Sequence, residues 1–159
     1  MKILLVSMVS LFSLISLAQE KPEEAFDFWL GKWEAKWYNP DSSIVYGSNT
    51  ITKILDSSVI EENFLSPTQK YKGRSLSIFN QTKRTWHQAY VDNFGNYYDF
   101  IGLFEENKKI FSTDTSKQII QRMVFYNLSE ESFTWDWEKS TDNGKTYQLS
   151  WRINYTRID

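Results

Sequence analysis

The sequence contains no cysteine and a single histidine, His87. Without cysteine the chain cannot form a disulfide, a thiolate nucleophile or a cysteine metal site, and no residue is available for lipoprotein acylation. One histidine is too few for the zinc motifs that need two. We therefore expect packing, rather than covalent or metal cross-links, to stabilise the fold.

Strong charge of one sign is also missing. The chain has 18 Lys and Arg against 20 Asp and Glu, a formal net charge of −2. Such mild acidity argues against a nucleic-acid partner. The sequence has neither a Gly-x-Ser-x-Gly nucleophile elbow nor a glycine-rich phosphate loop. We expect no cofactor and no metal, and the sequence assigns no catalytic residue.

Aromatic residues are abundant: 7 Trp, 9 Tyr and 11 Phe. Each buries on the order of 150–250 Å². The chain can therefore build a large apolar interior despite its lack of cross-links.

The N-terminus has the pattern of a secretory signal over residues 1–18. Lys2 precedes an apolar run from Ile3 to Leu17, and Ser16-Leu17-Ala18 fits the small-x-small cleavage site. Cleavage would leave residues 19–159 as one domain, exported to the periplasm or the medium, with no stable membrane insertion. The alternative is an uncleaved membrane anchor.

The segment from Phe26 to Trp33 predicts how the domain begins. It reads as a short apolar helix, a break at Gly31, and a first strand that carries Trp33, Ala35 and Trp37 on one face. Turn residues then recur at a spacing of about 8–12 residues, which is typical of an all-β sandwich or barrel. We count about ten strands in simple order, which favours an antiparallel up-and-down barrel with a short N-terminal helix.

Two connections carry further signals. Asn143-Gly144, between two alternating aromatic runs, is the strongest hairpin signal in the chain. Residues 66–73 form the longest polar connection, which predicts either a mobile loop at a cavity mouth or a plain connector.

The Gly31-Lys32-Trp33 triplet resembles the start of the calycin superfamily of lipocalin-like barrels. In lipocalins this Trp packs at the closed end beneath an Arg from a late strand, so the resemblance implies that Arg157 lies over Trp33. The chain also resembles a family of small secreted bacterial calycin-like proteins, a domain of unknown function with no established reaction. The matching motifs are Phe26–Trp33, Gly73–Phe79, Trp86–Asp92 and Ser140–Thr146.

The hairpin of residues 74–79 and 85–92 supplies candidate cavity residues. If Asn80 pairs with Thr85, one face mixes aromatic bodies with polar tips, as a cavity for a partly polar ligand requires. The alternative is a solvated outer face. The residues of this ligand-binding face are Ser75, Ser77, Phe79, Trp86, Gln88, Tyr90 and Asp92.

Other polar and aromatic residues have two interpretations each. His87 lies opposite the candidate face, and a locally bonded histidine is favoured over a haem ligand or general base. Asp136 and Glu138 are best explained by a solvated outer face. The aromatic stripe of Trp135, Trp137, Trp151 and Tyr155 is either a ligand platform or, as we favour, core.

The sequence therefore predicts an exported protein that holds a small, lipophilic or aromatic ligand inside a barrel, with a possible homo-oligomer. One alternative is an enzyme acting in the same cavity through Arg74, His87, Gln88, Tyr90 or Asp92. Others are a haem-binding barrel that uses His87, and a partner-binding role for the apolar outer face of Leu76, Ile78 and Val91.

Overall fold

The computed structural model describes residues 21–105 and 107–158, so the predicted signal sequence lies outside the described residues. Two short 3-10 helices precede ten strands. The helices are η1 (Pro22–Glu24) and η2 (Asp27–Trp29). The strands are β1 (Gly31–Tyr38), β2 (Ile44–Ile54), β3 (Val59–Ser66), β4 (Tyr71–Asn80), β5 (Thr85–Asp92), β6 (Tyr97–Glu105), β7 (Lys108–Ser112), β8 (Ile120–Tyr126), β9 (Ser132–Ser140) and β10 (Gln148–Ile158). No helix of the described part of the chain has the length and apolar character needed to cross a membrane.

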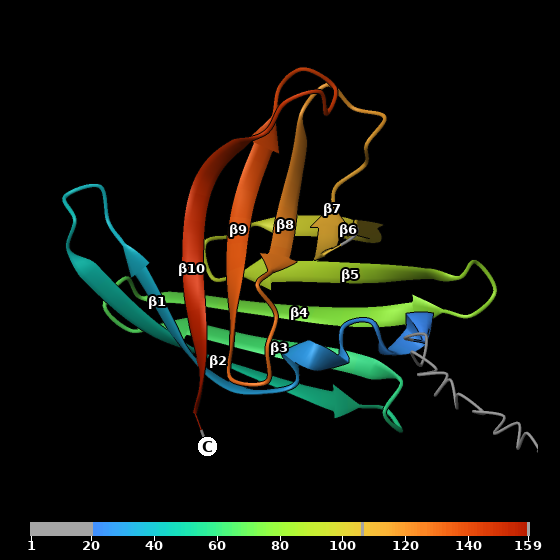
Figure 1. The fold of residues 1–159 in the computed structure, drawn as a ribbon, viewed down its shortest axis with the longest axis horizontal. Coiled ribbons are helices and arrows are strands. Elements are labelled where there is room, and N and C mark those ends of the chain that lie inside the picture. The colour runs from blue at the N-terminus through green and yellow to red at the C-terminus, as the bar shows by residue number, and fades with distance from the viewer. Residues whose placement is uncertain (1–20, 106, 159) are drawn as a thin grey trace, which may run out of the picture.

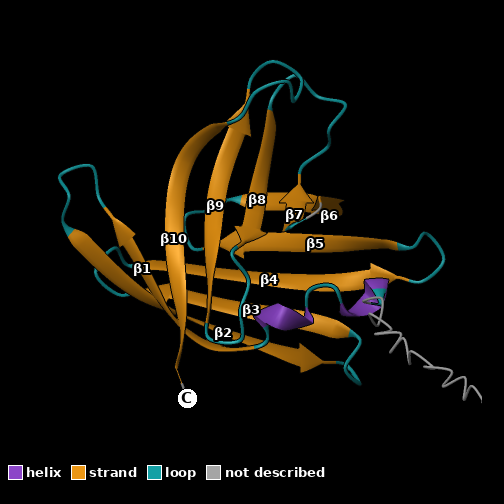
Figure 2. Ribbon diagram, viewed as in Figure 1, coloured by secondary structure: helices purple, strands orange, loops and turns teal. Residues whose placement is uncertain are grey.

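The ten strands form one closed antiparallel barrel (Figures 1 and 2). Each strand pairs with the next along the chain, and β1 closes the circle against β10. The prediction of an up-and-down barrel of about ten strands is confirmed. Alternation of inward and outward side chains gives every strand one face to bury, and closure gives every strand a hydrogen-bonded neighbour on both sides over at least part of its length.

The turns explain where the strands end. Asn143 and Gly144 both have positive φ, so the connection from β9 to β10 turns where the sequence predicted. The connection from β3 to β4 is shorter than predicted, because β4 begins at Tyr71 and only residues 67–70 stay outside the strands. The start of this strand was predicted as a polar loop because Lys70 and Lys72 flank Tyr71.

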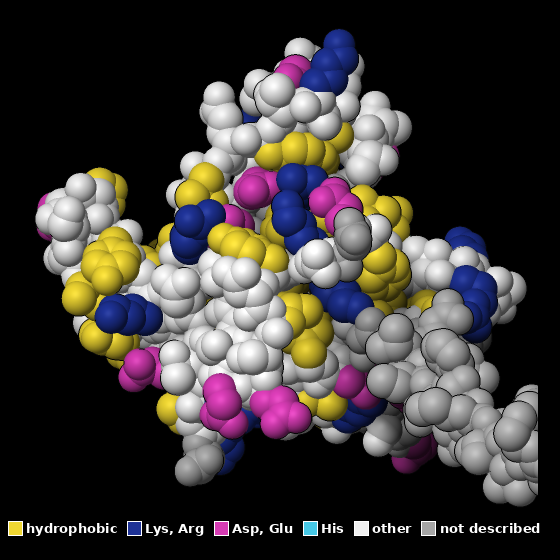
Figure 3. Space-filling model, viewed as in Figure 1, with side chains coloured by type: hydrophobic (Ala, Val, Ile, Leu, Met, Phe, Trp, Pro, Cys, Tyr) yellow, Lys and Arg dark blue, Asp and Glu magenta, His cyan; other side chains and the backbone are white. Residues whose placement is uncertain are grey.

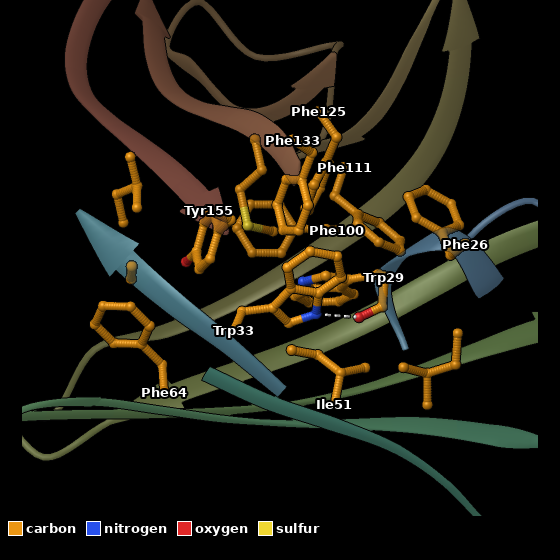
Figure 4. Packing of buried hydrophobic residues seen from close by; sticks show 14 of the residues in the cluster. Phe26, Trp29, Trp33, Ile51, Phe64, Phe100, Phe111, Phe125, Phe133 and Tyr155 are labelled. Atoms are coloured by element: carbon orange, nitrogen blue, oxygen red, sulfur yellow. Dashed lines mark hydrogen bonds between the residues drawn. The ribbon is translucent and has the colours of Figure 1, made fainter. Parts of the chain in front are cut away.

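The N-terminal segment plugs one end of the barrel. The predicted single helix is instead two 3-10 turns, separated by Ala25 and Phe26, and the backbone of Phe26 is not helical. Phe26 is fully buried and stacks on Phe111 at 4.2 Å between ring centroids. The indole of Trp33 donates to the Trp29 carbonyl at 2.8 Å, which joins the plug to β1 (Figure 4). The barrel thus has one closed end, packed with aromatic rings.

Basic and acidic side chains lie beside one another on the outer face of β8–β10 (Figure 3), where Arg122 pairs with Glu138 and Arg152 pairs with Asp136. Asp136 is only 4% exposed and accepts two hydrogen bonds from Arg152, each 2.7 Å. Glu138 accepts one from Arg122 at 2.7 Å. The predicted solvated face is therefore wrong for Asp136, whose pairing with the long Arg152 side chain covers it.

Candidate functional site

A cavity of about 850 Å³ occupies the half of the barrel away from the N-terminal plug. The position of each inward residue along its strand decides whether it packs in the plug or lines this cavity. On β1, Trp33 contacts the plug, while Trp37, four residues later, lines the cavity. On β9, Phe133 packs against Trp33, while Trp135 and Trp137 line the cavity.

The residues of the predicted ligand-binding face are distributed along the whole length of the barrel interior, and not only in the half that contains the cavity. The register that places Asn80 opposite Thr85 is confirmed, and Ser75, Ser77, Phe79, Trp86 and Gln88 are buried inside the barrel. Tyr90 and Asp92 line the cavity, whereas those five do not.

Most of these five side chains contact the N-terminal plug or form hydrogen bonds with one another. The Trp86 indole donates to the Pro22 carbonyl at 2.7 Å, and Gln88 donates to Ser77 at 2.9 Å. Five of the seven predicted residues therefore lie at the closed end or in the middle of the barrel rather than in the cavity wall.

Tryptophans form the main wall of the cavity. Trp151 meets Trp37 and Trp135 edge to face, at 5.3 and 5.4 Å between centroids. Trp137 contacts Tyr98 at 5.5 Å. The sequence favoured core for this stripe, and Tyr155 does belong to the buried core, with Trp135, Trp137 and Trp151 packed half-buried against it. All four also line the cavity. In the sequence, these four residues could be recognised only by their alternate spacing, which places them on one face of two paired strands. That spacing does not distinguish a core residue from a residue of a cavity wall.

Glu62 is a buried carboxylate in this aromatic cavity, and sequence reasoning missed it. It is 7% exposed and lines the cavity. Its Oε1 accepts from Asn49 at 2.8 Å, and its Oε2 accepts from Ser75 at 2.7 Å. Burial raises the pKa of the Glu62 carboxyl, against these two hydrogen bonds, which lower it. The available signal was its position between Ile60 and Phe64 on one strand face.

A second polar group lies where the cavity meets the loops. Tyr71 and Tyr90 share a hydrogen bond between their hydroxyls, and Tyr71 also donates to Asp92 at 3.1 Å. Burial, the largest influence, raises the pKa of both phenols, which keeps them neutral.

Asp92 stays ionised at the same end of the cavity. Burial raises its pKa, but hydrogen bonds from Asn96, Phe94 and Tyr71 together outweigh that effect and leave the pKa below its usual value.

The cavity opens along the seam between β1 and β10. These strands pair only from Lys32–Lys36 to Asn154–Ile158, and beyond that point they diverge (Figure 1). Consecutive residues on both sides of the seam line the cavity, Trp37–Pro40 on one side and Leu149–Tyr155 on the other. Inward and outward side chains alternate along a strand, so such consecutive lining indicates an opening at the strand edge.

His87 does not reach the cavity. It alternates with buried Trp86 and Gln88 on β5, pairs with Ile78 and Ile101, and is absent from the lining. Arg74 is also exposed on the outer face, so the five side chains of the enzyme alternative do not converge on one point. Within residues 21–105 and 107–158, no three His, Asp or Glu side chains form a potential metal-binding group.

No protein-family model matches the chain, and no curated protein matches it. Among solved structures it is similar to a redesigned β-barrel, with 11% sequence identity and a TM-score of 0.42. The alignment covers 86% of this chain and 96% of that one.

Proposed function

We propose that this protein is an exported binding protein that holds a small, largely apolar or aromatic ligand in the barrel cavity. One observation carries the proposal: the barrel contains an open cavity of about 850 Å³ lined mainly by aromatic and other apolar side chains. Ligand pockets in proteins typically measure about 300–1,000 Å³ and combine apolar walls with a few polar groups. Glu62, Tyr71, Tyr90 and Asp92 supply those polar groups here.

Water in this cavity would be in unfavourable contact with the apolar wall. Apolar surface in contact with water costs about 25 cal/mol per Å², so a ligand that covers the tryptophan wall gains affinity simply by displacing water. The few polar groups then orient the ligand. The seam between β1 and β10 gives the ligand a way in without opening the barrel.

Export and barrel type belong to the same proposal. Export rests on the signal-like residues 1–18, and amino-terminal sequencing of the periplasmic or secreted protein tests it. The calycin-like barrel type, and membership of the bacterial calycin-like family, are supported by Gly31-Lys32-Trp33 at the closed end and by Arg157 over Trp33. A homo-oligomer remains part of the hypothesis, and light scattering tests it.

Thermal shift across a lipophilic library, together with native mass spectrometry of protein purified from its host, tests ligand binding. Met123→Trp should place a larger ring in the cavity and weaken the thermal shifts. Ile101→Trp, which adds the same ring on the outer face, should leave the shifts unchanged. The proposal fails if no compound shifts the melting temperature and no ligand copurifies, or if both variants respond alike.

A further inference from the structure

We infer that the ligand is a cation, an amine on an apolar or aromatic body, and that its charged group contacts Glu62. This inference rests on the proposed function and narrows it to one ligand class. It follows from three features of the cavity: a carboxylate with unused acceptor capacity, a lining whose described residues include no unpaired cation, and a wall of aromatic faces.

The Glu62 carboxylate is only partly satisfied by the protein. Each of its oxygens accepts one hydrogen bond, from Asn49 and from Ser75. An ionised carboxylate has about four acceptor sites, so roughly half remain for a ligand. Because Glu62 lines the cavity, a ligand with N–H donors can use them.

The charges around the cavity favour a cation. In the described part of the chain, the charged side chains that line it are Glu62, Asp92 and Arg152. Arg152 is already neutralised by Asp136, which accepts hydrogen bonds from two of its nitrogens. The phenols of Tyr71 and Tyr90 are neutral. The lining therefore carries net negative charge, with Asp92 at the loop end and Glu62 deeper inside.

The aromatic wall suits the same ligand. A cation within about 6 Å of an aromatic ring centroid is attracted by the ring face, most strongly by tryptophan. Phe64 lies two residues from Glu62 on the same face of β3 and contacts Trp37 and Trp151, at 6.2 and 6.1 Å between centroids. A cation held by Glu62 would thus sit beside aromatic rings, and its apolar body would cover the remaining wall.

Burying a carboxylate without a cation is costly. Among the described residues that line the cavity, the one cation is Arg152, which pairs with Asp136 and not with Glu62. A ligand ammonium supplies the missing charge. Binding of a cationic ligand would therefore offset the unfavourable burial of the Glu62 charge.

Three indole compounds with the same aromatic body test the charge preference: tryptamine, tryptophol and indoleacetate, which are cationic, neutral and anionic. Isothermal titration calorimetry on the purified protein should show tryptamine binding about tenfold or more tightly than tryptophol, as a charge-assisted hydrogen bond predicts. Indoleacetate should bind most weakly.

The variant Glu62→Gln should remove the preference. Its amide can still accept from Asn49 and can donate to Ser75, so the fold should persist, which circular dichroism checks. Tryptamine affinity should fall about tenfold or more, while tryptophol affinity changes less than about twofold. The matched control is Glu61→Gln, the same change one residue earlier on the outer face, where Glu61 contacts Arg74; it should change neither affinity.

Tryptophol binding as tightly as tryptamine, or a preference that persists in Glu62→Gln, would overturn the inference. If library ligands shift the melting temperature but none of the three indoles binds, the cation inference fails and the proposed function stands. If no compound binds at all, both fail.

Discussion

Arg157 lies over the ring of Trp33, with its guanidinium carbon 4.1 Å from the ring centroid. The guanidinium also donates from Nη1 to the Leu30 carbonyl at 3.0 Å and from Nε to the Glu130 carbonyl. Gly31 makes room for it, because a side chain at this position would collide with Nη1. One residue of the last strand thus joins the plug, the first strand and the β8–β9 turn.

Arg157→Ala should therefore destabilise the barrel by about 2 kcal/mol, the sum of a cation–π contact and charge-assisted hydrogen bonds. Urea denaturation followed by tryptophan fluorescence measures the free energy of unfolding. The control is Arg84→Ala, whose guanidinium lies 5.5 Å from the Phe79 ring in an exposed turn and should cost less than about 0.5 kcal/mol. Equal losses in the two variants would show that Arg157 does not hold the closed end.

Phe26→Ala should cost about 3–5 kcal/mol, because it removes a fully buried ring from the stack on Phe111 and leaves a cavity in the plug. The same denaturation assay applies. Phe94→Ala, which truncates a ring that is 65% exposed in the β5–β6 turn, should cost less than about 1 kcal/mol. A small effect of Phe26→Ala would mean that the N-terminal segment can leave the barrel without unfolding it.

Glu62→Gln should raise the melting temperature of the unliganded protein at neutral pH. Burial raises the pKa of Glu62 in the folded state, so the folded protein holds this proton more tightly than the unfolded chain. The contribution of Glu62 to stability is therefore fully present below its unfolded pKa and is lost as pH rises through its folded pKa. Glutamine has no charge to bury, and the gain should be roughly 1 kcal/mol.

The gain should shrink toward zero in acid, where Glu62 is protonated in both states. Melting temperatures of the two proteins across a pH series measure this difference. The polar groups that interact with Glu62 are Asn49, Ser75, Tyr71, Tyr90 and Tyr155. Asp92 lines the same cavity, and its lowered pKa gives a pH dependence of opposite sign that is common to both proteins. A pH-independent difference would contradict the expected proton linkage.

Asp142 should stabilise the β9–β10 turn in its ionised form. It accepts hydrogen bonds from the Thr146 amide, the Thr146 hydroxyl and Ser140, and these lower its pKa to about 2 from 3.8. A lowered pKa gives stability that is present above 3.8 and is lost as pH falls through about 2. Asp142→Asn should thus lower the melting temperature at neutral pH.

That difference should disappear near pH 2. The control, Asp56→Asn, makes the same change in the β2–β3 turn, where the residue has positive φ that Asn also tolerates. It should leave the melting temperature unchanged at both pH values. If Asp142→Asn loses stability equally at neutral and acidic pH, its charge is not the cause.

The strand pattern was predictable because each cue is local. Alternation of apolar and polar residues, turn residues between runs, and Asn143-Gly144 act over a few positions, and together they predicted the ten strands and the register of β4 with β5. Errors arose where local composition misleads. Lys70 and Lys72 hid the start of β4, and Asp136 looked solvated because its partner Arg152 is sixteen residues away.

The sequence by itself determined which side chains share a face of each strand, since that follows from strand parity alone. It did not decide which of the two faces points into the barrel. Nor did it determine which side chains touch one another and which border empty space. The tertiary structure decided that, because the N-terminal segment fills one end with Phe26 and Trp29 and leaves Glu62 and the tryptophan wall around the other. A void depends on the summed volume of side chains from many distant strands within one barrel width, and no local pattern in the chain records that sum.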